Sequence, residues 1–220
     1  MLETISSSQP RPRGRELSPA GNIDRAVDPA LSLDQPMMLV KMALERGMLE
    51  EAAEAIAALI AEDPEEAEPW VLKGVAALLR GKNTEANDDF LAAAARGAEE
   101  RTTALGRTMA LMGLERFAEA WAITVKLSRQ HRDDPEVLHW LLRAGTALER
   151  WDAMAERLAI YLEERPEDHS ARFALAGVHV RRGDLVRARS EHEILRRVVP
   201  SFDGLDVLGS GIAALRRGRP

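Results

Sequence analysis

The chain has 220 residues and a formal net charge of −6, with 45% hydrophobic and 30% charged side chains, a composition typical of a soluble globular protein. It contains no cysteine, which excludes disulfide scaffolds, thiolate metal sites and cysteine nucleophiles. No apolar run approaches the roughly 20 residues that cross a bilayer, and the N-terminus lacks the apolar core of a secretory signal. We therefore expect a cytoplasmic protein without membrane insertion.

The charge is distributed unevenly along the chain. Residues 45–101 have six basic and fourteen acidic side chains, a net charge of −8. Residues 181–220 have nine basic and five acidic side chains, a net charge of +4. An acidic half disfavours nucleic acid as the main ligand, because the phosphate backbone binds to basic surfaces. The basic C-terminal end is either a solvated surface or a contact for an acidic partner.

Residues 1–32 differ from the rest of the chain. They contain four prolines and little periodic apolar content, which predicts a disordered or loosely attached tail. From Leu33 onward the apolar residues follow a helical pattern.

The helical part is built from a repeat of 34 residues. Five segments follow one another in one register without insertion, over residues 33–66, 67–100, 101–134, 135–168 and 169–202. Position 20 is small in four of the five segments, so two helices can approach closely there: Ala52, Ala86, Ala120, Met154 and Ala188. Position 15 suits the left-handed residue that ends a helix, although two segments lack the glycine: Gly47, Gly81, Glu115, Glu149 and Gly183. Position 32 is proline in three segments, which ends the second helix.

This pattern resembles the tetratricopeptide repeat, a helix–turn–helix unit of 34 residues. The second and fifth segments match the family most clearly. The matching residues are Trp70, Gly74, Gly81, Ala86, Phe90 and Ala93 in the second segment, and Leu175, Gly183, Ala188 and Pro200 in the fifth. The resemblance implies an all-α fold, a right-handed α-solenoid of five helix–turn–helix repeats whose first helices line the concave side. Residues 203–220 then form a C-terminal capping helix and tail, because a repeat array needs a cap over its last face.

In that register, positions 2, 5, 9, 12 and 13 of each repeat face the concave groove. The middle of the groove is apolar, and an exposed apolar strip with adaptable methionines marks a binding site. We therefore expect it to bind an apolar peptide or helix of another protein, with Arg143 and Arg181 holding acidic residues. The alternative is that tight curvature buries these residues as ordinary core. Leu79 also occupies one of these groove positions, position 13 of the second repeat. The residues predicted to bind the partner are Met37, Lys41, Val71, Val75, Leu78, Leu105, Met109, Met112, His139, Arg143, Phe173, Val180 and Arg181.

The sequence has no phosphate-binding loop, metal-ligand spacing or nucleophile–base motif. We therefore expect no enzymatic activity, cofactor or metal, and the favoured function is a protein–protein adaptor or scaffold. Two alternatives remain open: a secretion-type chaperone that masks an apolar cargo segment, and a regulatory module that uses the basic C-terminal end. The sequence also leaves open self-association through the repeat ends, and occupation of the groove by the N-terminal tail.

Two histidines occupy positions that usually pack inside a repeat. His179 and His192 are at positions 11 and 24 of the fifth repeat. We expect them to be partly buried structural residues with lowered pKa values, rather than metal ligands or a pH switch.

Overall fold

The computed structural model describes residues 29–217, with side chains from residue 36 to residue 216. Over this range the chain forms eleven α-helices and no strand. The first helix begins at Pro29, ahead of the predicted boundary at Leu33, and most of the predicted tail lies outside the described residues. The helices are α1 Pro29–Glu45, α2 Leu49–Glu62, α3 Ala67–Leu79, α4 Asn83–Ala95, α5 Glu100–Gly113, α6 Phe117–Gln130, α7 Pro135–Ala147, α8 Trp151–Glu164, α9 His169–Arg181, α10 Leu185–Val198 and α11 Leu205–Arg217.

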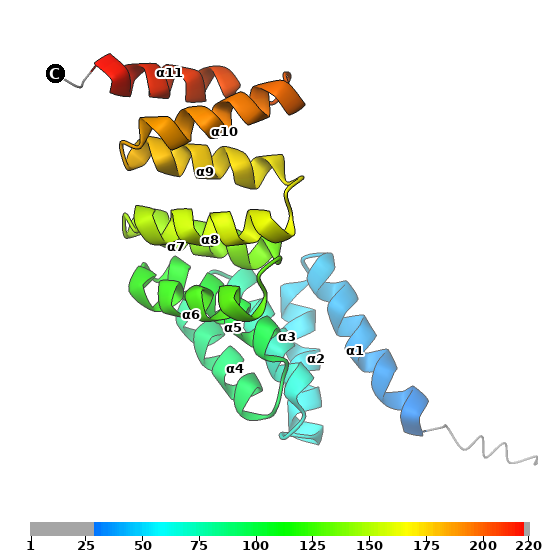
Figure 1. Cartoon of the computed structure of the whole chain (residues 1–220). Coiled ribbons are helices and arrows are strands. Elements are labelled where there is room, and N and C mark those ends of the chain that lie inside the picture. The colour runs from blue at the N-terminus through cyan, green and yellow to red at the C-terminus, as the bar shows by residue number, and fades with distance from the viewer. Residues whose placement is uncertain (1–28, 218–220) are drawn as a thin grey trace, which may run out of the picture.

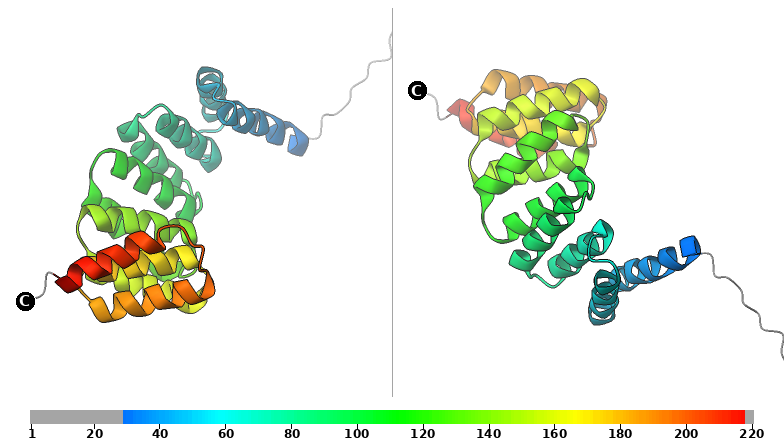
Figure 2. Two further views of the ribbon diagram at one scale, coloured as in Figure 1. Left: turned by 90° about the horizontal axis from the view of Figure 1, so that it is seen from above. Right: turned by 90° about the horizontal axis from the view of Figure 1, so that it is seen from below.

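Successive helices pack side by side and form an all-α helical repeat (Figure 1). The pairs α3/α4, α5/α6, α7/α8 and α9/α10 each span about one 34-residue unit. Helices α1 and α11 lie at opposite ends of the stack in all views (Figures 1 and 2). The helix directions turn along the array, because α8 to α11 run across the view of Figure 1 whereas α1, α2 and α4 run steeply.

The two helices of each repeat meet at position 20. The alanines Ala52, Ala86, Ala120 and Ala188 are completely buried there. The fourth repeat has the larger Met154 instead, and Gly145 lies opposite it: a Cβ atom at Gly145 would lie 2.7 Å from the Met154 side chain. A large side chain on one helix is therefore matched by a missing side chain on its neighbour, which keeps the interior close-packed.

The same pairing of large and small residues joins neighbouring repeats. The buried ring of Phe90 on α4 lies against Gly74 of its own repeat and Gly106 of the next. A Cβ atom would lie 3.0 Å from the ring at Gly74 and 2.4 Å from it at Gly106. Phe90 thus links α3, α4 and α5, and substitution of Gly106 by any larger residue would require the Phe90 ring or the helices around it to move.

The C-terminal helix closes the array. Leu205, Leu208 and Ile212 of α11 are buried against Leu185 and Leu195 of α10. The predicted capping segment therefore contains a helix whose apolar side packs on the last repeat.

Position 15 has a left-handed backbone in all five repeats. Gly47, Gly81 and Gly183 have φ angles of 73°, 71° and 71°. Glu115 and Glu149 adopt the same conformation, with φ angles of 58° and 54°. The turn geometry is thus kept where the glycine is absent, although it is unfavourable for a residue with a Cβ atom.

We predict that Glu115→Gly and Glu149→Gly each raise the free energy of unfolding by about 0.5–1 kcal/mol, because glycine removes the steric strain of a positive φ. Urea denaturation measures the change. The matched control is Glu156→Gly in the interior of α8, which should lower stability by about 1 kcal/mol. A loss of stability at positions 115 and 149 would contradict this interpretation of the turns.

Candidate protein-binding groove

The first helices of the second, third and fourth repeats enclose an apolar hollow. Its volume is about 410 Å³ and it lies between α3, α5 and α7, with one wall residue from α4. We call it the apolar hollow; it is lined by Val75, Leu78, Leu79, Phe90, Thr102, Leu105, Gly106, Met109, Glu136 and Trp140. Only two of these ten residues have polar side chains, so the hollow is suited to apolar groups.

The hollow follows from the spacing of residues along the first helices of these repeats, α3, α5 and α7, which we call the inner helices. Val75 and Leu79 are four residues apart on α3, and Leu105 and Met109 have the same spacing on α5. Residues four apart lie on one side of a helix, so each helix offers one pair to the same space. Leu105 is buried, whereas Leu79 is 55% exposed. The hollow therefore has a buried part and an open, solvent-facing part.

A second hollow of about 450 Å³ is lined by residues of α5 and α7, one of which is the positively charged Arg143. The Arg143 guanidinium lies 4.8 Å from the centroid of the Trp140 ring, which also lines the apolar hollow. The His139 ring meets Trp140 edge-on, with 5.3 Å between centroids. The cation hollow is lined by Met112, His139, Leu142, Arg143, Thr146 and Ala147. An apolar site and a positive charge are thus placed next to each other around Trp140.

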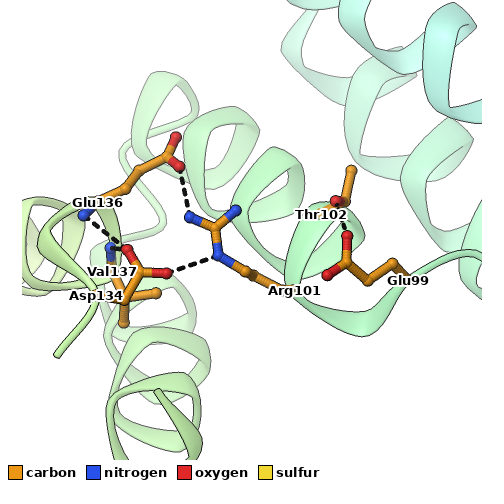
Figure 3. A network of polar contacts seen from close by, with 6 residues as sticks. All are labelled: Glu99, Arg101, Thr102, Asp134, Glu136 and Val137. Carbon is orange, nitrogen blue, oxygen red and sulfur yellow. Dashed lines mark hydrogen bonds and ion pairs between the residues drawn. The ribbon is translucent and has the colours of Figure 1, made fainter. Parts of the chain in front are cut away.

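Ion pairs tie α5 to the start of α7 beside the apolar hollow (Figure 3). Arg101 donates hydrogen bonds from Nε to Asp134 Oδ2 at 2.6 Å and from its terminal nitrogen to Glu136 Oε2 at 2.9 Å. Asp134 also caps α7, because its Oδ1 accepts hydrogen bonds from the backbone N–H groups of Glu136 and Val137. Arg101 therefore holds Glu136, a wall residue of the hollow, in place.

The environment of Asp134 changes its pKa. Burial alone would raise it, but the hydrogen bonds from Arg101 and from the backbone N–H groups of Val137 and Glu136 hold the pKa below its ordinary value. The carboxylate is therefore charged at neutral pH and contributes to stability in that form.

The structure brings about half of the predicted site residues together. Val75, Leu78, Leu105 and Met109 line the apolar hollow, and Met112, His139 and Arg143 line the adjoining one. These seven residues come from three neighbouring inner helices.

The other predicted residues have different surroundings. Met37 is buried in the core between α1 and α2, and Val71 packs against the cluster around Phe90. Lys41 pairs with Glu68 at 2.5 Å, and the Arg181 guanidinium lies 5.6 Å from the centroid of the Trp151 ring.

The C-terminal end covers two further predicted residues. The ring centroid of Phe173 lies 5.4 Å from that of Phe202, and Val180 packs on the cluster that contains Ile212. The predicted groove is therefore apolar and open along α3, α5 and α7, but α9 contributes its apolar residues to the cap.

Phe90 and Trp140 line the apolar hollow, although the sequence pattern did not predict them as groove residues. Trp140 is at position 6 of its repeat, outside the set of positions expected to face the groove. The available signal was Gly106, the position-6 residue of the preceding repeat, because the missing side chain there leaves space for the Phe90 ring.

The two histidines at packing positions lie in different environments. His179 is buried, and burial lowers its pKa from the ordinary value; Asp184 opposes this shift and Arg182 adds to it. His192 is partly buried, with Nε2 3.2 Å from the carbonyl oxygen of Leu205. Between residues 36 and 216 the His, Asp and Glu side chains form no cluster of three arranged for a metal ion. None of the helices described here has the length and apolarity of a membrane span.

The family model of the tetratricopeptide repeat matches residues 37–101 and 141–193, which together exceed half of the chain. The chain belongs to the tetratricopeptide-repeat family. Members of this family are generally non-enzymatic modules that bind other proteins. A sequence search of curated proteins finds no significant match.

Solved structures of this family share the fold. PilF of Pseudomonas aeruginosa has 17% sequence identity and a TM-score of 0.63, over 84% of each chain. YrrB, described as a TPR protein with an unusual peptide-binding site, has 15% identity and a TM-score of 0.65, over 80% of this chain and 90% of its own. MamA of Desulfovibrio magneticus RS-1 has 15% identity and a TM-score of 0.61, over 84% of this chain and 96% of its own.

We predict that Asp134→Ala lowers the free energy of unfolding by about 1–2 kcal/mol, because it removes both the cap of α7 and the partner of Arg101. Asp134→Asn should cost less, since the amide oxygen can still cap the helix. The advantage of wild type over Asp134→Asn should be present above about pH 4 and disappear as the pH falls through the lowered pKa. Urea denaturation at pH 7 and pH 3 tests this; an equal advantage at both values would exclude the ion pair as its source.

We also predict that the free energy of unfolding falls as the pH is lowered, because burial lowers the pKa of His179 in the folded protein. A histidine with a lowered pKa contributes its full stability above about pH 6.5, and loses it as the pH falls from there towards the folded pKa. The melting temperature of wild type should therefore fall between pH 8 and pH 5 by more than that of His179→Gln. Identical pH dependence in the two proteins would show that His179 does not titrate on unfolding.

Proposed function

We propose that the protein is a non-enzymatic adaptor that binds an apolar peptide or helix of a partner protein along α3, α5 and α7. The observation that carries the proposal is the apolar hollow, in which Leu79 and Met109 from neighbouring inner helices line one open space. Grooves of this kind receive the apolar side of a short segment. The structural likeness to YrrB, which is described as having a peptide-binding site, supports a peptide as ligand.

The side chains that line the two hollows indicate which kind of peptide segment would bind there. Two or three apolar side chains would enter the apolar hollow, where Met109 can adapt to their shape. An acidic residue of the segment would then lie next to the Arg143 guanidinium, which the Trp140 ring holds in position. This arrangement uses Arg143, which lines the second hollow, but not Arg181, which lines neither of the two hollows.

The adaptor function is favoured over a chaperone function by the size of this site. A volume of about 410 Å³ accommodates a few side chains, which fits a short motif better than a long apolar cargo segment. The basic C-terminal end, residues 181–220, remains a second surface for an acidic partner, and two of its arginines, Arg182 and Arg187, line a separate hollow of about 540 Å³ between α8, α9 and α10.

We predict that Leu79→Gln with Met109→Gln weakens partner binding at least tenfold, because about 1.4 kcal/mol or more of apolar burial is lost. Glutamine has similar size and helix propensity, so the fold should be kept. The matched control is Leu91→Gln, since Leu91 is an exposed leucine of α4 that does not line either hollow.

The measurement is comparative capture from native lysate with wild type and both variants, after circular dichroism has shown that each is folded. We expect a protein that is retained by wild type and Leu91→Gln and lost by the double variant. Its binding segment, made as a peptide, should show the same order of affinities by calorimetry. Equal retention by all three proteins would exclude the apolar hollow as the binding site.

A further inference from the structure

One side of α1 is apolar and uncovered. Val40 and Leu44 are buried against α2 and α3. On the opposite side of the helix, which we call the outer side of α1, Met38 and Leu39 are 61% and 65% exposed, and Met42 is 36% exposed. Within residues 29–217 the helices that pack on α1 are α2 and α3, so no neighbour in this range covers its outer side.

The same side of the first helix is covered in the four later repeats. Met42 is at position 10 of its repeat, and the residues at that position in the later repeats are at most 5% exposed: Ala76, Ala110, Ala144 and Val178. Each of them packs in a cluster with residues of the second helix of the preceding repeat, for example Ala76 with Ile56 of α2 and Val178 with Leu158 of α8. At each of these junctions the covering helix is therefore the segment that directly precedes the covered helix in the chain.

Residues 1–28 directly precede α1 and lie outside the described residues. Their second half, residues 15–28, contains three large apolar residues among charged and polar ones, at Leu17, Ile23 and Val27. The cap of a repeat array needs this combination, with apolar groups towards the array and polar groups towards water.

This segment is long enough to reach the outer side of α1. Met42 lies 13 residues beyond Pro29, which is about 20 Å along the axis of the helix. The twelve residues from Leu17 to Asp28 can span up to about 40 Å, so they can run back along α1 as far as Met42. Because Pro19 interrupts a regular helix, we expect an irregular strap over α1 rather than a further helix of the array.

We propose that residues 15–28 fold back over the outer side of α1 and close the N-terminal end of the array, as α11 closes its C-terminal end. The two helices lie at opposite ends of the stack (Figures 1 and 2), and a repeat array needs a cap over each terminal face. The segment is favoured over a second copy of the chain because it is tethered to α1, which gives it an effective concentration on the order of millimolar. The cap leaves the apolar hollow between α3, α5 and α7 open, so the proposal is independent of the proposed groove function.

Pairs of introduced cysteines test where the segment lies, because the chain has no cysteine of its own. In the full chain one cysteine replaces Ile23, and the other replaces Leu39 on the outer side of α1, Leu79 in the apolar hollow or Leu91 on α4. These leucines are 65%, 55% and 42% exposed, so all variants should keep the circular dichroism and melting temperature of wild type. The three variants are Ile23→Cys/Leu39→Cys, Ile23→Cys/Leu79→Cys and Ile23→Cys/Leu91→Cys.

The readout is the rate of disulfide formation within one chain in oxidised glutathione, followed by mass spectrometry in dilute protein. We expect Ile23→Cys/Leu39→Cys to form its disulfide at least tenfold faster than the other two variants, because the cap holds the two Cβ atoms within bonding distance. Ile23→Cys/Leu91→Cys is the matched control, since it reports the chance collisions of a tethered segment with an exposed site.

Oxidation of exposed methionines by hydrogen peroxide gives a second measurement. Met38 and Met42 should oxidise about fivefold more slowly in wild type than in a variant whose segment lacks the apolar residues, because the cap shields their sulfur atoms. Met48, which is 43% exposed and follows α1, should oxidise at the same rate in both proteins. The variant is Leu17→Gln/Ile23→Gln/Val27→Gln.

Four results would overturn the proposal. Equal disulfide rates in the three cysteine variants would show that the segment has no fixed position on α1. A fastest rate in Ile23→Cys/Leu79→Cys would show that the segment occupies the apolar hollow instead. Disulfides that form between two chains and not within one would show that a second copy covers α1. Equal oxidation of Met38 and Met42 in wild type and the glutamine variant would show that the segment does not shield them.

Discussion

The close approach of two helices at one position of every repeat determines the rest of this structure. Where position 20 is alanine, its small side chain is completely buried, and where it is Met154, the facing residue is Gly145. Each repeat buries little apolar area by itself, so the stack is stable because neighbouring repeats share one core. Phe90 shows this sharing most clearly, since its ring fills the space left by glycines in two successive repeats.

The groove is a consequence of that packing. Because every repeat orients its first helix in the same way, residues at equal positions of α3 and α5 come side by side. Apolar residues at positions 9, 12 and 13 of α3 and at positions 5 and 9 of α5 therefore line one hollow. Single departures from this pattern on α7, such as Arg143 and Trp140, place a cation at the edge of the apolar hollow. The ion pairs of Arg101 then fix α7 relative to α5 beside this edge.

The sequence predicts the helical repeat well because the repeat is a local pattern with a fixed length. It also predicts which residues of α3 and α5 share a face, since these follow from helical spacing. It does not predict that Phe173 and Val180 are covered, because that depends on how the loop before α11 folds back on α9. The register marks position 15 as the end of the first helix, but it does not show that Glu115 and Glu149 adopt the left-handed conformation there, because residues with a Cβ atom do not prefer it. The wall position of Phe90 depends on Gly106 in the neighbouring repeat, which the pattern of a single repeat does not contain.

The central claim is that the apolar hollow contacts a partner protein directly, and site-specific photocrosslinking measures that contact. A photoreactive amino acid would replace Leu79 in one protein, Met109 in a second and Leu91 in a third, each expressed as the full chain in its native cell. The account predicts crosslinks from positions 79 and 109 to one short segment of the same partner, and none to that segment from position 91. Crosslinks to that partner from position 91 alone, or no difference among the three positions, would contradict it.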